Sequence, residues 1–349
     1  MHAAASAPPT GVKARPTLRD VALLAGVSTK TVSRVVNGEA GVSPPKLAAV
    51  RRAITQLDYR PNFTASSLRR SSGRSAAIAA VLEDLANPFS AALHRALEDA
   101  ARERGVLIFA GSVDESPERE RDLIHAFTMR QADALVVVPA SDDQSYLAGE
   151  VSAGTPVVFV DRPPVGLPVD AVLADNLRGA ASAVHHLAAH GHRDIAYLGD
   201  LQTIATARER FQGFREALAE HGIRPAAAVH DLHTEHGSAA AVRRLLAGDS
   251  PPTALFTSQN LVTIGAIRTL QQLGRQHEVA LVGFDDFPLA DLLQPAVTVI
   301  AQDPSEMGRV AASLIFRRLD GEQWRPRTHL VATRLIPRGS GEISGPHRQ

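Results

Sequence analysis

From residue 76 onward, short apolar runs alternate with stretches of helical periodicity, and this alternation constrains the fold more than any other feature. The runs are "AAIAAVL", "VLIFAG", "ALVVVP", "PVVFVD", "IAYLGD", "TALFTS" and "VALVGFDD". A run that is apolar on both faces is typical of a strand buried in a parallel sheet, and the intervening helices supply the crossovers. The sequence therefore predicts an α/β core with parallel sheets.

Motifs that mark common enzyme classes are missing from this alternating region. No GxGxxG or P-loop run accompanies the strands, and no GxSxG elbow is present. The chain also has no cysteine, which removes disulfides, thiolate metal sites and a cysteine nucleophile. We predict a protein that is not an enzyme and has no cofactor, with Ser, His and Asp residues assembled by the fold as the alternative.

Four histidines gather in "VHHLAAHGHRD", where His186 and His190 lie four residues apart on an expected helix. That spacing can bind zinc. However, no Glu lies between them as in a zinc protease motif. We therefore predict no metal site and assign these histidines a structural role.

The net charge of zero hides an uneven distribution along the chain. Residues 1–74 carry 12 Lys and Arg against 3 Asp and Glu, whereas the rest of the chain carries 25 against 34. A basic segment joined to an acidic body indicates that the segment meets a polyanion. A basic disordered tail is the simpler interpretation, but apolar residues at helical spacing from Leu18 onward favour a folded domain.

The basic segment contains two short helical patterns joined by a glycine turn. Thr17 followed by Asp20 is a capping-box start, and Gly26 ends the first helix. Ser28 can cap a second helix, and "SPPKLAAVRRAITQL" predicts a third helix with Ser43 as its cap. We expect a helix-turn-helix whose three helices share one small core.

The second helix has a polar face without a carboxylate, because no acid occurs between Asp20 and Glu39. The DNA major groove admits a helix and offers hydrogen-bonding edges to Thr, Lys and Arg, whereas phosphates repel acids. We predict that this face binds DNA, and a merely solvated polar face is the alternative. The expected inward residues are Val32, Val35 and Val36, and the expected outward residues are Thr29, Lys30, Ser33 and Arg34.

Further along, "YRPNFTASSLRRSSG" adds a short helix that Asn62 could cap and a linker. With "DVALLAGVSTKTVSRVVNG", this segment resembles the DNA-binding head and hinge of the lactose-repressor (LacI) family of bacterial transcription regulators. The resemblance implies that Thr29, Lys30 and Arg34 contact base edges in the major groove. It also implies that Leu68 wedges into the minor groove, with an ordinary amphipathic role as the alternative. The predicted DNA-binding residues are Ser28, Thr29, Lys30, Thr31, Arg34, Asn37, Asn62, Ala65 and Leu68.

The resemblance continues to about Ile336, where the core is similar to the two-lobed fold of LacI-family cores and periplasmic sugar-binding proteins. Ligands of open α/β sheets bind beyond the carboxyl ends of the strands, so the polar residues there are the candidates. Their carboxylates, amides and guanidinium suit a polyhydroxylated ligand. Ser90 and Gln259 replace the family's usual aromatic and Asn, so the ligand need not be ribose. The predicted effector-binding residues are Asn87, Phe89, Ser90, Asp161, Arg162, Arg210, Gln259, Asp285 and Gln302.

These observations predict an all-α helix-turn-helix head and hinge helix, followed by a two-lobed α/β core with parallel sheets. The predicted boundaries are a disordered N-terminal tail at 1–16, the helix-turn-helix domain at 17–61, the hinge helix and linker at 62–75, the effector-binding and dimerisation domain at 76–338, and a C-terminal tail at 339–349.

The predicted function is a transcriptional regulator, in the family pattern a repressor, that binds double-stranded DNA at a pseudo-palindromic operator as a homodimer. Its partner in the cleft would be a sugar or sugar derivative. The chain opening lacks a secretory apolar run and no segment is long enough to span a bilayer, so we expect a cytoplasmic protein without a membrane partner. The alternative is a cytoplasmic carbohydrate-binding or carbohydrate-modifying protein with a non-regulatory basic head.

Overall fold

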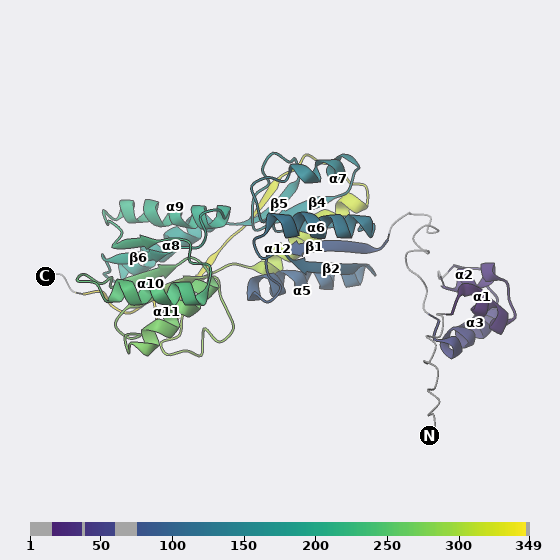
Figure 1. Ribbon diagram of the computed structural model, residues 1–349, viewed down its shortest axis with the longest axis horizontal. Helices are drawn as coiled ribbons and strands as arrows, with labels where there is room; N and C mark the ends of the chain where they lie inside the picture. Colours follow the sequence, from purple (N-terminus) through teal and green to yellow (C-terminus); the bar gives the residue numbers. More distant parts are fainter. Residues whose placement is uncertain (1–15, 37–38, 60–74, 347–349) are drawn as a thin grey trace, which may run out of the picture. The chain divides into compact units, whose positions relative to one another are not determined.

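The computed structural model describes residues 16–36, 39–59 and 75–346. The chain forms two compact units, Met1–Ser75 and Ala76–Gln349, which we call the head and the core (Figure 1). Among the described residues, no helix is both long enough and apolar enough to cross a membrane.

The described part of the head contains the helices α1 (Leu18–Ala25), α2 (Thr29–Val36) and α3 (Pro44–Leu57). Helix α1 begins at a capping box, in which the Thr17 hydroxyl accepts from the Asp20 amide at 3.3 Å and the Asp20 carboxylate accepts from the Thr17 amide at 2.7 Å. Gly26 ends α1 at a φ of 65°, a left-handed conformation that glycine adopts without steric cost. Ser28 caps α2 by accepting from the Thr31 amide at 3.2 Å.

One small apolar core holds the head together. Val32 is fully buried, and Val35 and Val36 are partly buried against it, as the sequence pattern predicts. Thr29 and Lys30 are exposed. Ser43 precedes α3 without making a side-chain capping bond, so the start of α3 rests on the proline at its first position. The buried core residues are Val21, Ala22, Val32, Val50, Ala53 and Tyr59.

Lobe 1 of the core has a parallel sheet in the order β11-β5-β4-β3-β1-β2. Helices α5 and α12 cover one face and α6 covers the other, because alternate strand residues pack in opposite directions. The strands are β1 (Ala77–Leu82), β2 (Leu107–Ser112), β3 (Ala134–Val137), β4 (Val157–Val160), β5 (Asp170–Ala174) and β11 (Thr328–Val331). The helices are α5 (Pro88–Glu103), α6 (Pro117–Met129), η1 (Ser145–Leu147), α7 (Ala148–Ser152) and α12 (Pro304–Leu319).

Lobe 2 repeats this plan with the order β12-β10-β9-β8-β6-β7, in which only β12 runs antiparallel to its neighbour among the described strands. Helices α8 and α9 cover one face, and α10 and α11 cover the other. The strands are β6 (Ile195–Leu198), β7 (Ala227–Val229), β8 (Ala254–Thr257), β9 (Ala280–Phe284), β10 (Thr298–Ala301) and β12 (Arg334–Ile336). The helices are α8 (Asn176–Ala189), α9 (Ala205–Glu220), α10 (Glu235–Leu246) and α11 (Asn260–Gln272).

The chain passes between the lobes at 174–176, 301–304 and 331–334 (Figure 1). Each lobe is therefore assembled from segments that are distant in the sequence. Crossings of this kind leave two rigid sheets joined by short connections, an arrangement that permits hinge motion between them.

Residues 339–346 are packed into lobe 2, so a C-terminal tail beginning at residue 339 is a prediction that the structure corrects. Ser340 is buried, its hydroxyl donates to the Leu281 carbonyl at 2.6 Å, and it accepts from the Thr298 amide at 2.9 Å. The Gly345 amide donates to the His190 carbonyl at 2.8 Å. These short polar residues satisfy backbone groups at the sheet, which composition alone does not reveal.

Histidines of "VHHLAAHGHRD" lie against the same segment, residues 339–346. His186 Nε2 lies 2.6 Å from Glu342 Oε1, and the ring of His190 lies 4.5 Å from that of His186. The buried His192 donates from Nε2 to the Ile343 carbonyl at 2.8 Å. These contacts join α8 and the loop after it to the end of the described chain.

Candidate functional site

One cavity of about 70 Å³ lies between the lobes, at the carboxyl ends of strands from both sheets. Every residue predicted to bind an effector lines it: Asn87, Phe89, Ser90, Asp161, Arg162, Arg210, Gln259, Asp285 and Gln302. The remaining lining residues are Glu83, Glu115, Val138, Asp200, Ile204, Thr206, His233, Asn260 and Leu261.

Asn87 links the two lobes at one side of this cavity. As the N-cap of α5, its Oδ1 accepts from the Phe89 amide at 3.0 Å. The same Oδ1 accepts from Asn260 Nδ2 at 2.9 Å, and Asn260 is the first residue of α11 in lobe 2. The amide pair therefore joins two helix N-termini across the cavity.

Arg162 follows β4 and is almost fully buried in lobe 1. Its guanidinium donates to both carboxylate oxygens of Glu115, at 2.5 and 2.7 Å, and to the Pro139 carbonyl at 2.8 Å. Its Nε lies 3.7 Å from Asp161. This fork of bonds fixes the position of Arg162 and raises the pKa of its guanidinium above the ordinary value.

Arg210, on α9, is the buried arginine that lobe 2 contributes to the cavity. Its Nε donates to Asn176 Oδ1 at 2.8 Å and its Nη1 donates to the Ser258 carbonyl at 2.7 Å. Close packing of α9 on α8 allows this position, because a Cβ at Gly213 would collide with the Leu177 carbonyl. The side chain is 5% exposed, so its charge needs partners inside the protein.

Asp285 provides the carboxylate nearest to Arg210, with Oδ2 at 3.7 Å from Nη1. Its Oδ1 accepts from Gln302 Nε2 at 2.6 Å. The Arg210 guanidinium also lies 3.9 Å above the Phe284 ring. Guanidinium, carboxylate and amide therefore meet at one wall of the cavity, with the buried Phe284 ring packed against the guanidinium.

Asp161 and Asp285 share an uncommon backbone conformation, with φ of 69° and 70°. Each directly follows a strand, β4 in lobe 1 and β9 in lobe 2. Left-handed backbone at residues other than glycine is sparsely populated and concentrates at functional sites. The matching strain supports a shared role for the two carboxylates at the cavity.

The sequence prediction missed Glu83, Glu115, Asp200, His233 and Asn260. The first three follow β1, β2 and β6, where the same strand-end rule would have found them in "VLED", "VDES" and "LGDL". His233 follows β7, a strand that the apolar runs did not indicate. Asn260 was adjacent to a predicted residue and had no separate signal.

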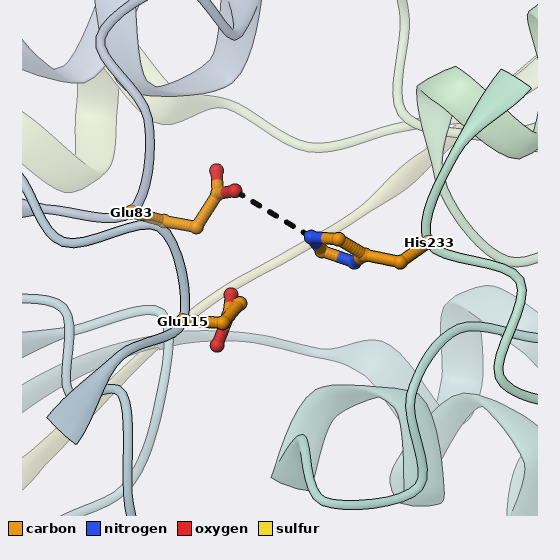
Figure 2. Close-up of side chains that lie close together, drawn as sticks. All are labelled: Glu83, Glu115 and His233. Carbon is orange, nitrogen blue, oxygen red and sulfur yellow. Dashed lines mark ion pairs between the residues drawn. The ribbon is translucent and has the colours of Figure 1, made fainter.

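Figure 2 shows Glu83 and Glu115 of lobe 1 facing His233 of lobe 2. Each offers one atom to a group in which all three atoms lie within 4.8 Å of one another. His233 Nε2 is 3.9 Å from Glu83 Oε1, and His233 Nδ1 donates to Asp200 Oδ1 at 2.7 Å. The bond to Asp200 orients the imidazole toward the two glutamates.

The carboxyl groups that line the cavity outnumber its guanidinium groups. Its lining contains the guanidinium groups of Arg162 and Arg210, opposed by a larger set of carboxylates: Glu83, Glu115, Asp161, Asp200 and Asp285. Burial raises the pKa of Asp161 and that of Asp285. Burial and the nearby Glu115 raise the pKa of Glu83 to about 7. The hydrogen bond to Asp200 raises the pKa of His233.

A larger groove of about 480 Å³ lies between α5 and α12 on lobe 1. Its arginines are paired with carboxylates on the same helices or close to them, for example Arg95 with Asp99 and Arg309 with Glu306. It does not include a strand end, and the predicted residues do not line it. The inter-lobe cavity is therefore the better candidate for a ligand site.

The predicted DNA-binding face of α2 is partly available to solvent. Arg34 is turned toward the segment after α2, where it donates to the Ala40 carbonyl and lies 3.5 Å from Glu39. Gly41, at a φ of 90°, allows this approach, because a Cβ there would lie 2.8 Å from Arg34 Nη2. A base contact by Arg34 would thus have to compete with these bonds.

The other members of the predicted DNA-binding set divide into two groups. Ser28 caps α2, and Thr31 Oγ1 lies 3.0 Å from the Ser28 hydroxyl. Asn37, Asn62, Ala65 and Leu68 lie outside the described residues, as do the predicted N-terminal tail through residue 15 and the hinge through residue 74.

Two family descriptions match the chain. Residues 17–62 match bacterial regulatory proteins of the lacI family, and residues 184–341 match a periplasmic binding protein-like domain. The first match spans the head helices and the second spans most of lobe 2.

Curated relatives match along nearly the whole chain. The HTH-type transcriptional regulator PtxS of Pseudomonas aeruginosa is 33% identical over 341 residues, which cover 95% of this chain and 98% of PtxS. The HTH-type transcriptional regulator CelR of Thermobifida fusca is 34% identical over 339 residues, which cover 94% of this chain and 98% of CelR.

Solved structures share the fold. The lac repressor dimer bound to operator and the anti-inducer ONPF superposes with a TM-score of 0.83 at 26% identity, covering 94% of this chain and 99% of that chain. A CelR–cellobiose complex superposes with a TM-score of 0.68 at 33% identity, covering 93% and 100%.

A helix-turn-helix head followed by a two-lobed core with a polar cavity between the lobes defines the class of regulators built on a periplasmic binding protein-like fold. The relatives make the assignment specific: the chain belongs to the lacI family of bacterial regulatory proteins. It is therefore a DNA-binding transcriptional regulator and not an enzyme, which confirms the predicted family, fold class and function.

Proposed function

We propose that this protein binds a pseudo-palindromic operator in the cytoplasm as a homodimer, represses transcription there, and is controlled by a sugar or sugar derivative held between its lobes. The observation that carries this proposal is the cavity itself, whose polar side chains come from both lobes of a chain that also has a helix-turn-helix head. The lac repressor structure contains a dimer and an operator, and the CelR structure contains cellobiose, which supports both partners.

DNA recognition would rest on α2. Thr29 and Lys30 are exposed on it, and Lys30 and Arg34 are its charged residues. Lysine and arginine contacts to phosphates supply salt-dependent affinity, and arginine contacts to guanine supply specificity. A homodimer would present two such helices to two half-sites.

Control by the ligand would act on the lobes. The cavity of about 70 Å³ holds little more than two water molecules at about 30 Å³ each, whereas small-molecule pockets measure about 300 Å³ or more. A sugar would therefore either extend into the adjoining hollow of about 350 Å³, which shares Phe89, Asp285 and Gln302 with the cavity, or displace contacts that join the lobes. Such contacts are Asn87 to Asn260 and Asp142 to Arg208 at 3.3 Å. Because the ligand would favour one lobe arrangement over the other, it would shift the population of the DNA-binding state.

The DNA-binding part is tested by selecting genomic fragments with the purified intact protein at increasing salt. We expect a few enriched sites with half-sites in inverted orientation and an affinity that falls steeply with salt concentration. Uniform recovery of fragments, with no common sequence, would instead favour a sugar-binding protein with a non-regulatory head. A thermal-shift screen of sugars then identifies the effector class independently of DNA.

A further inference from the structure

The charged groups of the inter-lobe cavity indicate which charge the effector has. Arg162 and Glu115 neutralise each other through two hydrogen bonds, and Arg210 lies near Asp285. The lining carboxylates still outnumber the guanidinium groups. A neutral sugar can donate hydroxyl hydrogens to such carboxylates, but it supplies no charge to offset their burial.

Glu83 has weaker hydrogen-bonding and electrostatic partners than the other carboxylates that line the cavity. Its side chain is 20% exposed, and the described part of the chain provides no hydrogen-bond donor to its carboxylate. Its nearest cationic partner is His233, at 3.9 Å. Burial together with Glu115 raises the pKa of Glu83 to about 7, which means that this position favours an added positive charge.

His233 places its Nε2 at the same position. Nδ1 donates to Asp200 at 2.7 Å, which raises the pKa of the imidazole and directs Nε2 toward Glu83, where it accepts a hydrogen bond only in the neutral form. Without a ligand, a proton on Nε2 would serve as the local donor to Glu83. A bound cation would replace that proton.

The spacing of the three acceptor atoms lies between the values expected around zinc and around an ammonium group, so it is compatible with either cation and the charge of the cavity decides between them. The atoms of Glu83, Glu115 and His233 lie within 4.8 Å of one another, and the Glu83–His233 pair is 3.9 Å apart. Tetrahedral zinc ligands at about 2.0–2.2 Å from the metal would lie only about 3.4 Å apart. The acceptors around an ammonium group, each about 2.8 Å from the nitrogen, would lie about 4.6 Å apart.

We propose that the effector carries a primary ammonium group, as an amino sugar does, and that Glu83, Glu115 and His233 accept its three N–H bonds. The inference rests on the proposed function, in which this cavity is the effector site. The sugar hydroxyls would then face Asp161, Arg210 and Asp285 on the other walls. Sugar phosphates and sugar acids would be rejected by the same surplus of carboxylates.

Isothermal titration calorimetry with the intact protein tests this. The probes are glucose, galactose, mannose and cellobiose, each compared with its amino, N-acetylamino and phosphorylated counterparts, and ZnCl₂ by itself. We expect at least one amino sugar to bind at least tenfold more tightly than its neutral parent. The Glu83→Gln variant should lose that preference while it keeps the affinity for the neutral parent, and Glu98→Gln on the exposed face of α5 should behave as the wild type.

The outcomes separate this inference from the function on which it rests. Neutral or phosphorylated sugars that bind more tightly than the amines, and lose binding in Arg210→Ala, would overturn the ammonium subsite and leave the sugar-effector function intact. Zinc binding lost in Glu83→Gln, without amine binding, would make the cluster a metal site. Absence of binding by every sugar in the set would count against both proposals.

Discussion

Asn260 Nδ2 donates to Asn87 Oδ1 at 2.9 Å, a hydrogen bond that joins the N-terminus of α11 in lobe 2 to that of α5 in lobe 1. Asn260 is 1% exposed, and its own Oδ1 is buried without a hydrogen-bond partner in the described structure. One amide therefore contributes both to lobe contact and to the polar wall of the cavity.

Asn260→Ala should shift the ligand-free core toward separated lobes. Loss of one hydrogen bond costs about 0.5–1.5 kcal/mol, which is a change of about two- to tenfold in the equilibrium between the lobe arrangements. Because the chain has no native cysteine, spin labels at Arg102→Cys on α5 and Arg244→Cys on α10 can report the distance between the lobes. Dilution with unlabelled chain isolates the intramolecular signal. The measured distances should become longer or more broadly distributed. The control variant is Gln271→Ala on the outer part of α11. If Asn260→Ala gives the same distance distribution as this control, the bond does not hold the lobes together.

Arg210→Ala should abolish the response to ligand while operator affinity stays within about threefold. The substitution removes the donors to Asn176 and to the Ser258 carbonyl and leaves Asp285 without its buried cation. Breaking a buried pair costs on the order of 3–5 kcal/mol, so the melting temperature should fall as well. Arg210→Lys keeps the charge but loses the fork of donors, and it should retain folding and still bind ligand weakly. Normal ligand affinity in Arg210→Lys, measured by calorimetry, would contradict the assigned role.

Arg34→Ala should relax operator preference. A base contact by arginine contributes about 1–3 kcal/mol of discrimination, so the ratio of specific to non-specific affinity should fall by roughly tenfold or more. Fluorescence anisotropy on operator and scrambled duplexes measures this ratio. Arg52→Ala, on the exposed side of α3, is the matched control and should change it little. Equal loss of affinity for both duplexes in Arg34→Ala would show a phosphate contact instead of base recognition.

Glu83→Gln should stabilise the ligand-free protein at pH 8 and leave its stability unchanged near pH 4. The pKa of Glu83 in the folded protein is raised from 4.5 to about 7, so its ionised form disfavours folding above pH 7. That penalty disappears as the pH falls from 7 to 4.5, where the unfolded chain also becomes protonated. The expected gain at pH 8 is about 1–3 kcal/mol in the free energy of unfolding, measured by urea denaturation. Equal free energies of unfolding of the wild type and Glu83→Gln at both pH values would contradict this prediction.

Most of the strands that the sequence predicted are buried inside a sheet, although "VLIFAG" became the edge strand β2 and the buried β10 was not predicted. The runs "AAIAAVL", "ALVVVP" and "PVVFVD" became β1, β3 and β4, each fully buried. Strands β7, β11 and β12 lie at sheet edges and are partly exposed, so their apolar signal is weak. The sequence also could not reveal β5 readily, because it begins with the buried Asp170, which accepts from Arg318 and Trp324 about 150 residues away.

The sequence prediction led to residues at one cavity where these residues follow strong strands and resemble a known family pattern. Asp161 and Asp285 follow β4 and β9, and the cavity includes both. The strand-end rule could have found Glu83, but the approach of Glu83 to His233 could not be predicted, since it joins the segment after β1 of one lobe to the segment after β7 of the other. No local sequence pattern indicates that Glu83 and His233 lie close together.

The central claim is that occupation of the inter-lobe cavity controls operator binding, and thermodynamic linkage tests it most directly. The operator dissociation constant of the intact protein is measured by anisotropy at zero and at saturating concentrations of a ligand whose binding depends on Arg210. The account predicts a change of at least tenfold in the operator dissociation constant, and an equal change in the ligand dissociation constant when operator is saturating. A ligand that binds in the cavity but leaves both constants within twofold would contradict it.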